Sequence, residues 1–147
     1  MTKPRMHRIR SKVGDVIAIP LSSGHFAFGR ILHDEGLAVY DCVSNEISTI
    51  QHLNISGVKF YVYFFKTSVV SGAWPIIGHV EEADPIADWP PPMFVADVIN
   101  PSNLRIYDRG EIRQATAKEV AGLEQQRMWY PVGLIAEIER RFGLHNN

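Results

Sequence analysis

Histidine is the residue type in this sequence that could most directly build a metal site. Zinc sites take three or four histidine or cysteine ligands, often at short regular spacings. The six histidines are scattered without such spacing, although His25, His33 and His79 lie in strand-like segments that a sheet could bring together. We interpret them as ordinary surface or hairpin histidines, and we predict no metal and no cofactor.

The residues that could serve as nucleophiles also lack the surroundings that catalysis needs. Cys42 is the single cysteine, and no signature of a catalytic cysteine surrounds it, so we interpret it as a small buried residue. No serine stands in a Gly-x-Ser-x-Gly turn, and the pair Gly24 and Gly29 lacks the lysine of a phosphate-binding loop. We therefore predict no catalytic residues and no enzyme activity.

A group of acidic residues beside a tryptophan is the candidate for a partner-binding site. It precedes a run of three prolines at residues 90–92, which favours an extended, solvated backbone. A solvated loop explains this composition, but so does a docking edge, because aromatic anchors beside charges recur in protein interfaces. The candidate residues are Glu81, Glu82, Asp84, Asp88 and Trp89.

Two further features could suggest nucleic-acid binding. Residues 60–65 are rich in aromatics, which could stack on bases or could form a core, and few basic residues interleave them. The first twelve residues carry cations without any acid, which could form a nucleic-acid or membrane arm, but we interpret them as a solvated terminus. These cations are Lys3, Arg5, Arg8, Arg10 and Lys12. The formal net charge of -1 argues against a chain built mainly to bind nucleic acid.

The length and composition predict one globular domain. The chain has 147 residues, of which 46% are hydrophobic and 21% charged. We expect residues 1–12 to form a basic, flexible arm and residues 13–147 to form the domain. No stretch is typical of a signal peptide or a membrane span, and one cysteine suits a reducing compartment, so we expect a cytoplasmic protein.

Short strand-like segments separated by turn residues make up most of the chain, and helical segments follow them. This order predicts an α+β fold: a strongly curved, mainly antiparallel, barrel-like sheet with two C-terminal helices packed on it. Residues 46–53 could form a short helix or a loop. The predicted strands are residues 13–21, 25–33, 37–43, 58–66, 74–81, 93–99, 104–108 and 111–115.

Capping signals place the two predicted helices at residues 117–130 and 131–143. Thr116 and Glu119 have the spacing of a capping box, and Pro131 starts a new element. In the second helix one narrow apolar stripe should face the sheet, with Ile138 and Phe142 in its buried surface. The full stripe is Leu134, Ile135, Ile138 and Phe142.

Several sequence words, in this order, resemble the immunity protein 26 family of bacterial polymorphic-toxin systems. They are residues 13–21 (VGDVIAIPL), 26–31 (FAFGRI), 74–78 (WPIIG), 122–124 (GLE) and 128–129 (MW). The resemblance covers roughly residues 12–143. It implies an α+β domain that binds and neutralises a cognate toxin without catalysing a reaction, and it assigns no catalytic residue.

The resemblance therefore implies a toxin domain as the partner, a basic nuclease being one kind that an acidic loop would attract. Two other interpretations stay open at this point. One is a nucleic-acid-binding module with a β-barrel core and the basic N-terminal arm. The other is a small-molecule hydrolase or sensor with an unrecognised site. The residues do not reveal the oligomeric state.

Overall fold

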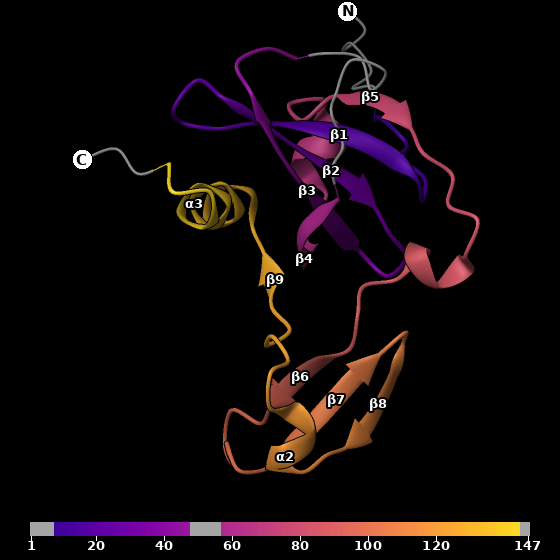
Figure 1. The fold of residues 1–147 in the computed structure, drawn as a ribbon, viewed down its shortest axis with the longest axis vertical. Coiled ribbons are helices and arrows are strands. Elements are labelled where there is room, and N and C mark those ends of the chain that lie inside the picture. The colour runs from indigo at the N-terminus through magenta and orange to yellow at the C-terminus, as the bar shows by residue number, and fades with distance from the viewer. Residues whose placement is uncertain (1–7, 48–56, 145–147) are drawn as a thin grey trace, which may run out of the picture.

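The computed structural model describes residues 8–47 and 57–144 and shows an α+β fold with two sheets (Figure 1). The larger sheet has the strand order β5-β1-β2-β3-β4-β9, and the smaller has the order β6-β7-β8. The larger contains β1 (Asp15–Pro20), β2 (Phe26–Ile31), β3 (Gly36–Ser44), β4 (Val58–Phe64), β5 (Ile76–His79) and β9 (Met128–Trp129). The smaller contains β6 (Met93–Ala96), β7 (Leu104–Asp108) and β8 (Glu111–Gln114). The helices are α1 (Thr67–Ser71), α2 (Ala117–Val120), α3 (Pro131–Arg141) and a 3-10 turn at Pro85–Asp88.

Strands β1 to β4 form an antiparallel meander, which confirms the first four predicted strands. The β2–β3 turn places Asp34 and Glu35 at φ 60° and 62°. Tight hairpins favour this left-handed backbone because its twist matches that of the flanking strands. Strand β9 then joins β4 in the parallel direction, so the sheet is mixed.

The larger core lies on one face of the six-stranded sheet, and α3 covers it. Leu134 and Ile138 of α3 have no exposed surface, which confirms the predicted burial of Ile138. Phe142 ends the helix and is only half-buried, although it packs against the same core. The buried members are Ile17, Ile19, Leu21, Ala27, Ile31, Leu37, Val39, Phe60, Val62, Phe64, Val69, Trp74, Leu134 and Ile138.

The opposite face of the same sheet carries a second, smaller apolar cluster. It is made of Val16, Ala18, Phe28 and Tyr40, which alternate with residues of the larger core along their strands. Strand β4 likewise directs Phe60, Val62 and Phe64 into the larger core. The aromatics of residues 60–65 therefore serve largely as core.

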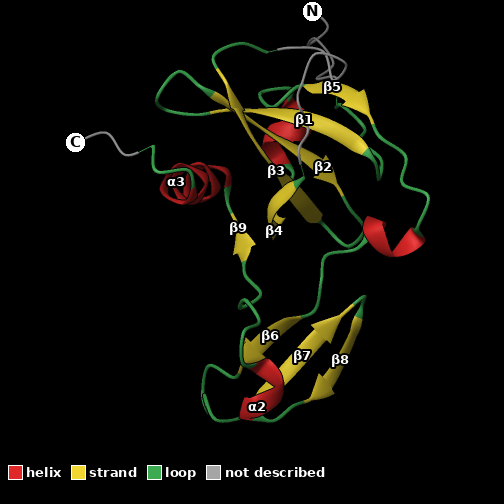
Figure 2. Ribbon diagram, viewed as in Figure 1, coloured by secondary structure: helices red, strands yellow, loops and turns green. Residues whose placement is uncertain are grey.

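The smaller sheet contacts the larger one through a few aromatic and apolar side chains. Tyr107 of β7 packs edge-on against Tyr63 of β4, with ring centroids 5.8 Å apart, and its hydroxyl donates to Asp34. Met93 of β6 is buried, and the backbone of Phe94 forms a β-bridge with Gln125 on the segment that returns to the larger sheet. Figure 2 shows α2 beside this smaller sheet, whereas α3 lies against the larger one.

Two parts of the predicted fold are wrong. Neither sheet is closed or strongly curled, because the edge strands β5 and β9 do not pair with each other in the described structure. The prolines at 90–92 have no N–H to donate to a ladder, and the chain after them forms a separate sheet instead of extending the first.

The predicted first helix is also much shorter than expected. The Thr116–Glu119 capping box is present, but α2 ends at Val120. Gly122 lies at φ 84°, the left-handed backbone that stops helices. The chain then returns to the larger sheet as β9, so only α3 packs there. The segment 46–53 and the cations Lys3 and Arg5 lie largely or wholly outside the described residues.

Candidate functional site

Arg30 fixes the acidic loop, residues 81–88, against the second face of the larger sheet. Its side chain is 4% exposed. Nε donates to the carbonyl oxygen of Val80 at 2.9 Å, and Nη1 donates to that of Ala87 at 3.2 Å. Nη2 donates to Asp88 Oδ1 at 2.6 Å. One buried guanidinium thus holds both ends of the loop, and Asp88 is committed to the fold.

His79 joins the start of the loop to β1. Its Nδ1 lies 2.9 Å from Asp15 Oδ1, and its Nε2 lies 2.5 Å from Glu81 Oε1. The hydrogen bond to Glu81, and after it that to Asp15, raises the pKa of His79. Two carboxylates on one ring favour the imidazolium, which donates from both nitrogens.

The remaining predicted site residues lie at different places on the loop. Asp84 Oδ1 accepts from the backbone N–H of Ile86 at 3.0 Å and caps the 3-10 turn. Glu82 is exposed and lines a small hollow, whereas Trp89 is half-buried with its ring 4.7 Å from that of His33. Glu82 and Trp89 thus line different hollows, and Asp84 lines neither of them.

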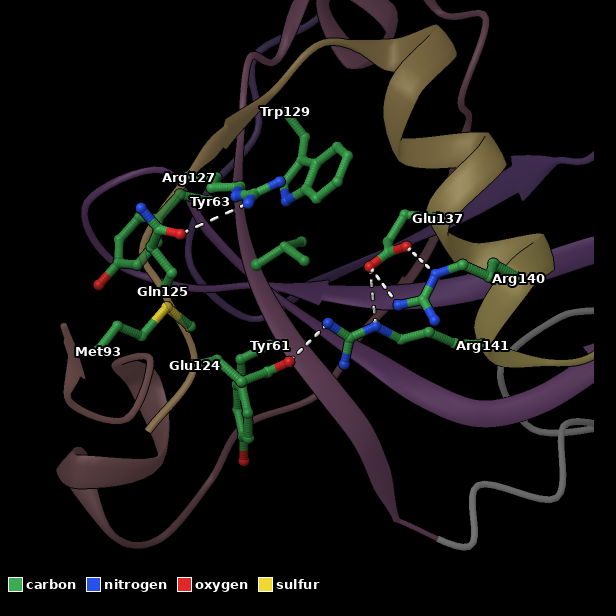
Figure 3. Close-up of a pocket in the computed structure, with 11 residues that line it drawn as sticks. Tyr61, Tyr63, Met93, Glu124, Gln125, Arg127, Trp129, Glu137, Arg140 and Arg141 are labelled. Atoms are coloured by element: carbon green, nitrogen blue, oxygen red, sulfur yellow. Dashed lines mark hydrogen bonds and ion pairs between the residues drawn. The ribbon is translucent and has the colours of Figure 1, made fainter. Parts of the chain in front are cut away.

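Three hollows meet at Tyr61 of β4, and we call them together the Tyr61 surface. The largest is about 380 Å³, the second about 310 Å³ and the smallest about 130 Å³. Tyr61 lines all three. The largest lies between β4, α3 and the segment before β9 (Figure 3). The second lies between the proline run and the β7–β8 turn, and the smallest is bordered by Glu82 and Arg30.

A chain of ion pairs spans the largest hollow and joins its walls (Figure 3). Arg141 Nη2 donates to Glu124 Oε1 at 2.5 Å and Arg141 Nε donates to Glu137 Oε2 at 3.2 Å. Arg140 binds both oxygens of Glu137, at 2.6 and 2.9 Å. The bonds from Arg140 and Arg141 hold the pKa of Glu137 below its usual range despite partial burial. These contacts tie α3 to the segment that returns from the smaller sheet.

The histidines of the described strands and turns each make different contacts. His25 Nδ1 lies 2.9 Å from Ser23 Oγ, the His33 ring packs at a tilt against Trp89, and His79 binds carboxylates. Among residues 8–47 and 57–144, no group of three or more histidine, cysteine or acidic side chains could hold a metal. Cys42 is half-buried where we predicted burial, and desolvation raises the pKa of its thiol.

The i,i+4 spacing of Glu137 and Arg141 predicted one ion pair of the largest hollow, and the structure confirms it. Sequence reasoning missed Tyr61, Arg30 and the pair between Arg141 and Glu124. Arg30 carried a readable signal, because a cation inside an apolar strand needs a partner. Tyr61 looked like an ordinary member of an alternating strand. Its exposure depends on how the smaller sheet and the acidic loop pack beside it, which no local pattern encodes.

Within the described residues, no helix is long and apolar enough to cross a membrane. Comparisons with curated proteins and with solved structures give no significant match. The family model described as "Immunity protein 26" matches residues 12–104. This confirms the resemblance over most of the chain, although the match ends before the GLE and MW words. Immunity proteins are generally non-catalytic, and membership implies a toxin-neutralising role. The chain belongs to the immunity protein 26 family.

Proposed function

We propose that this protein binds the toxin domain encoded beside it and blocks that domain's activity in the cytoplasm, with the Tyr61 surface at the centre of the contact. Family membership supports the toxin as partner. The observation that carries the placement is the meeting of three hollows at Tyr61. We also propose that residues 13–147 act as one domain, because Tyr107–Tyr63 and Arg141–Glu124 contacts join its parts.

The lining of the Tyr61 surface has the composition of an interface centre. Tyrosine, tryptophan and arginine dominate binding energy in protein complexes, and they act in concave, desolvated pockets. The hollows provide Tyr61, Trp89 and Trp129, with arginines on both sides. Rigid aromatic rings also lose little conformational entropy on binding. Neutralisation then requires only that the bound chain cover or distort the toxin's own site.

The acidic loop supplies the rim in this proposal, with Glu81, Glu82, Asp84 and Asp88 near the edge and Trp89 closer to the centre. Rim charges mainly set the association rate with a basic partner, and salt screens them. Asp88 acts indirectly, because it holds Arg30. Reversing Glu81, Glu82 and Asp84 should therefore slow association at low salt with a fading effect as salt rises. A change from Trp89 to Ala should speed dissociation, by about tenfold if the ring is worth 1.4 kcal/mol.

Co-expression with the toxin from the neighbouring gene tests the proposed function. Cells that carry both genes should survive, whereas cells with the toxin alone should die. Equal killing with and without this protein would contradict the immunity role. The charge-reversal variant at Glu81, Glu82 and Asp84 and the Trp89→Ala variant are each tested in the same way, and their association and dissociation rate constants are measured with the purified toxin domain. If both variants protect the cells and both rate constants are unchanged, the immunity role stands and only the placement of the rim is refuted.

A nucleic-acid-binding module finds less support in this fold. That alternative assumed a β-barrel core, whereas the larger sheet is open. Phe60 and Phe64 are buried in its core instead of facing a ligand. Binding to DNA or RNA that weakens steeply with salt would revive it.

A further inference from the structure

The loop between β6 and β7, residues 97–103, exposes two adjacent aliphatic side chains almost completely. Val98 is 96% exposed and Ile99 is 94% exposed, the highest values for large apolar side chains among the described residues. Both are β-branched, and neither is used by the fold. A single exposed aliphatic is ordinary, but a fully exposed adjacent pair forms an apolar protrusion.

Hydrogen bonds hold this protrusion in place. Asp97 Oδ1 accepts from the backbone N–H groups of Ile99 at 2.8 Å and Asn100 at 3.2 Å. The Asn103 N–H donates to the carbonyl oxygen of Asn100 at 2.9 Å, and that of Asp97 donates to Asn103 at 3.3 Å. The bonds from the Ile99 and then the Asn100 N–H group keep the pKa of the Asp97 carboxyl below its usual range. A mobile loop would lose conformational entropy on binding, whereas this loop is already ordered in the free protein and loses little.

The loop's position relates it to the Tyr61 surface. The β7–β8 turn lies at that surface, since Asp108 and Arg109 line the second hollow. The β6–β7 loop lies at the other end of β7, away from the larger sheet (Figure 1). Five residues of strand separate the two ends by roughly 15 Å. A standard interface covers roughly 800 Å² of each partner, which is roughly 30 Å across, so one partner can reach both.

From these observations we propose that Val98 and Ile99 insert into an apolar depression on the cognate toxin domain, as a second contact beside the Tyr61 surface. This inference rests on the proposed function. This loop lies inside residues 12–104, which the family model matches. Because the family's ligand is a toxin, this location favours the toxin as the partner that covers Val98 and Ile99. The polar residues Asn100, Ser102 and Asn103 follow the pair in the same loop, and polar residues beside an apolar centre are typical of an interface.

The test measures binding of the neighbouring gene's toxin domain, in a catalytically inactivated form, to full-length variants. The double change Val98→Ser and Ile99→Ser should raise Kd at least about tenfold, mainly through faster dissociation. Val132→Ser is the matched control, because Val132 is an 83% exposed valine on α3, and it should stay within twofold of the original chain. Neither variant should change the melting temperature, because these side chains are exposed. The single change Ile99→Ser should raise Kd less than the double change does.

Each other outcome decides against the inference. A double variant whose Kd stays within twofold of the original would overturn it while leaving the immunity role standing. If a second copy of this chain covers Val98 and Ile99 instead, sedimentation of the free protein would show a dimer, and the double variant would be a monomer. That result would also overturn the inference. Failure of the unmodified protein to bind this domain would contradict the proposed function and remove this inference with it.

Discussion

Arg30 is the residue on which the placement of the acidic loop depends. Its guanidinium is buried and makes three hydrogen bonds to the loop. Removing one partner of a buried pair leaves the other without compensation, which is more costly than losing an exposed pair. The position of the loop therefore depends on a side chain of the sheet in addition to the loop's own Asp84 cap.

Arg30→Met should lower the free energy of unfolding by about 3 kcal/mol. The reason is that Asp88 loses its compensating charge and the carbonyl oxygens of Val80 and Ala87 lose their donor. Urea denaturation would measure it. Arg109→Met is the control, because its pair with Asp108 is exposed, and it should cost about 0–1 kcal/mol. Equally small losses of unfolding free energy for both variants would show that the hydrogen bonds of Arg30 to the loop are not needed for stability.

His79 should make stability depend on pH. Its folded-state pKa is raised by Glu81 and then by Asp15, so its contribution is fully present below the unfolded value of about 6.5. That contribution is lost as pH rises through the higher folded value. The melting temperature should accordingly fall across that window, and His79→Gln should flatten this fall. An imidazole that NMR shows titrating at or below about 6.5 would contradict the bonded geometry.

At the scale of elements, close packing between the β2–β3 hairpin and the proline run fixes how the loop leaves the larger sheet. A Cβ on Gly36 would lie 2.4 Å from Pro90 Cγ, and the Gly36 backbone has no positive φ that would explain glycine otherwise. Glycine is needed there because two segments approach each other. The rings of Trp89 and His33, one residue before Pro90 and three before Gly36, pack against each other at a tilt.

Gly36→Ala should therefore destabilise the protein by about 1–3 kcal/mol through overpacking. Gly133→Ala gives a contrasting control, because its new Cβ would meet Trp129 at an ordinary 3.5 Å and it lies inside α3. Alanine is favoured over glycine in helices by about 1 kcal/mol, so this change should stabilise. Thermal melts of both variants would check the pair, and opposite signs are expected.

Helix α3 provides a second element-scale prediction. Ile138→Ala should cost about 2–5 kcal/mol, because Ile138 is fully buried. Phe142→Ala should cost less than the 3–5 kcal/mol typical of a fully buried phenylalanine, since its ring is half-buried. Chemical denaturation compares the two directly. A larger loss at Phe142 would mean that its contact with the core dominates the docking of α3.

Considered as a whole molecule, the fold divides into what local sequence encodes and what packing adds. Alternation and turn residues predicted the meander, and the capping box at Thr116 and Glu119 was correct. The open sheet, the short α2 and the return of β9 depend on pairing across about 65 residues, which local periodicity cannot specify. Gly122 does favour a helix end, and the prediction of a helix over residues 117–130 did not take it into account.

The candidate site divides in the same way. The acidic residues and Trp89 were identifiable from composition, but Asp88 proved to be a structural partner of Arg30. The Tyr61 surface forms only where β4, α3, the proline run and the smaller sheet come together. Its parts are far apart in the sequence, so their joint surface could not be predicted from any one segment.

The binding affinity of a Tyr61→Ala variant for the inactivated toxin domain of the neighbouring gene tests the central claim most directly. Titration calorimetry should show a Kd raised by about thirtyfold or more, since a central aromatic is worth about 2 kcal/mol. Tyr130→Ala is the matched control, because Tyr130 is 68% exposed outside the three hollows, and its Kd should stay within about threefold. Equal affinity of the Tyr61→Ala variant and the original protein would contradict the account.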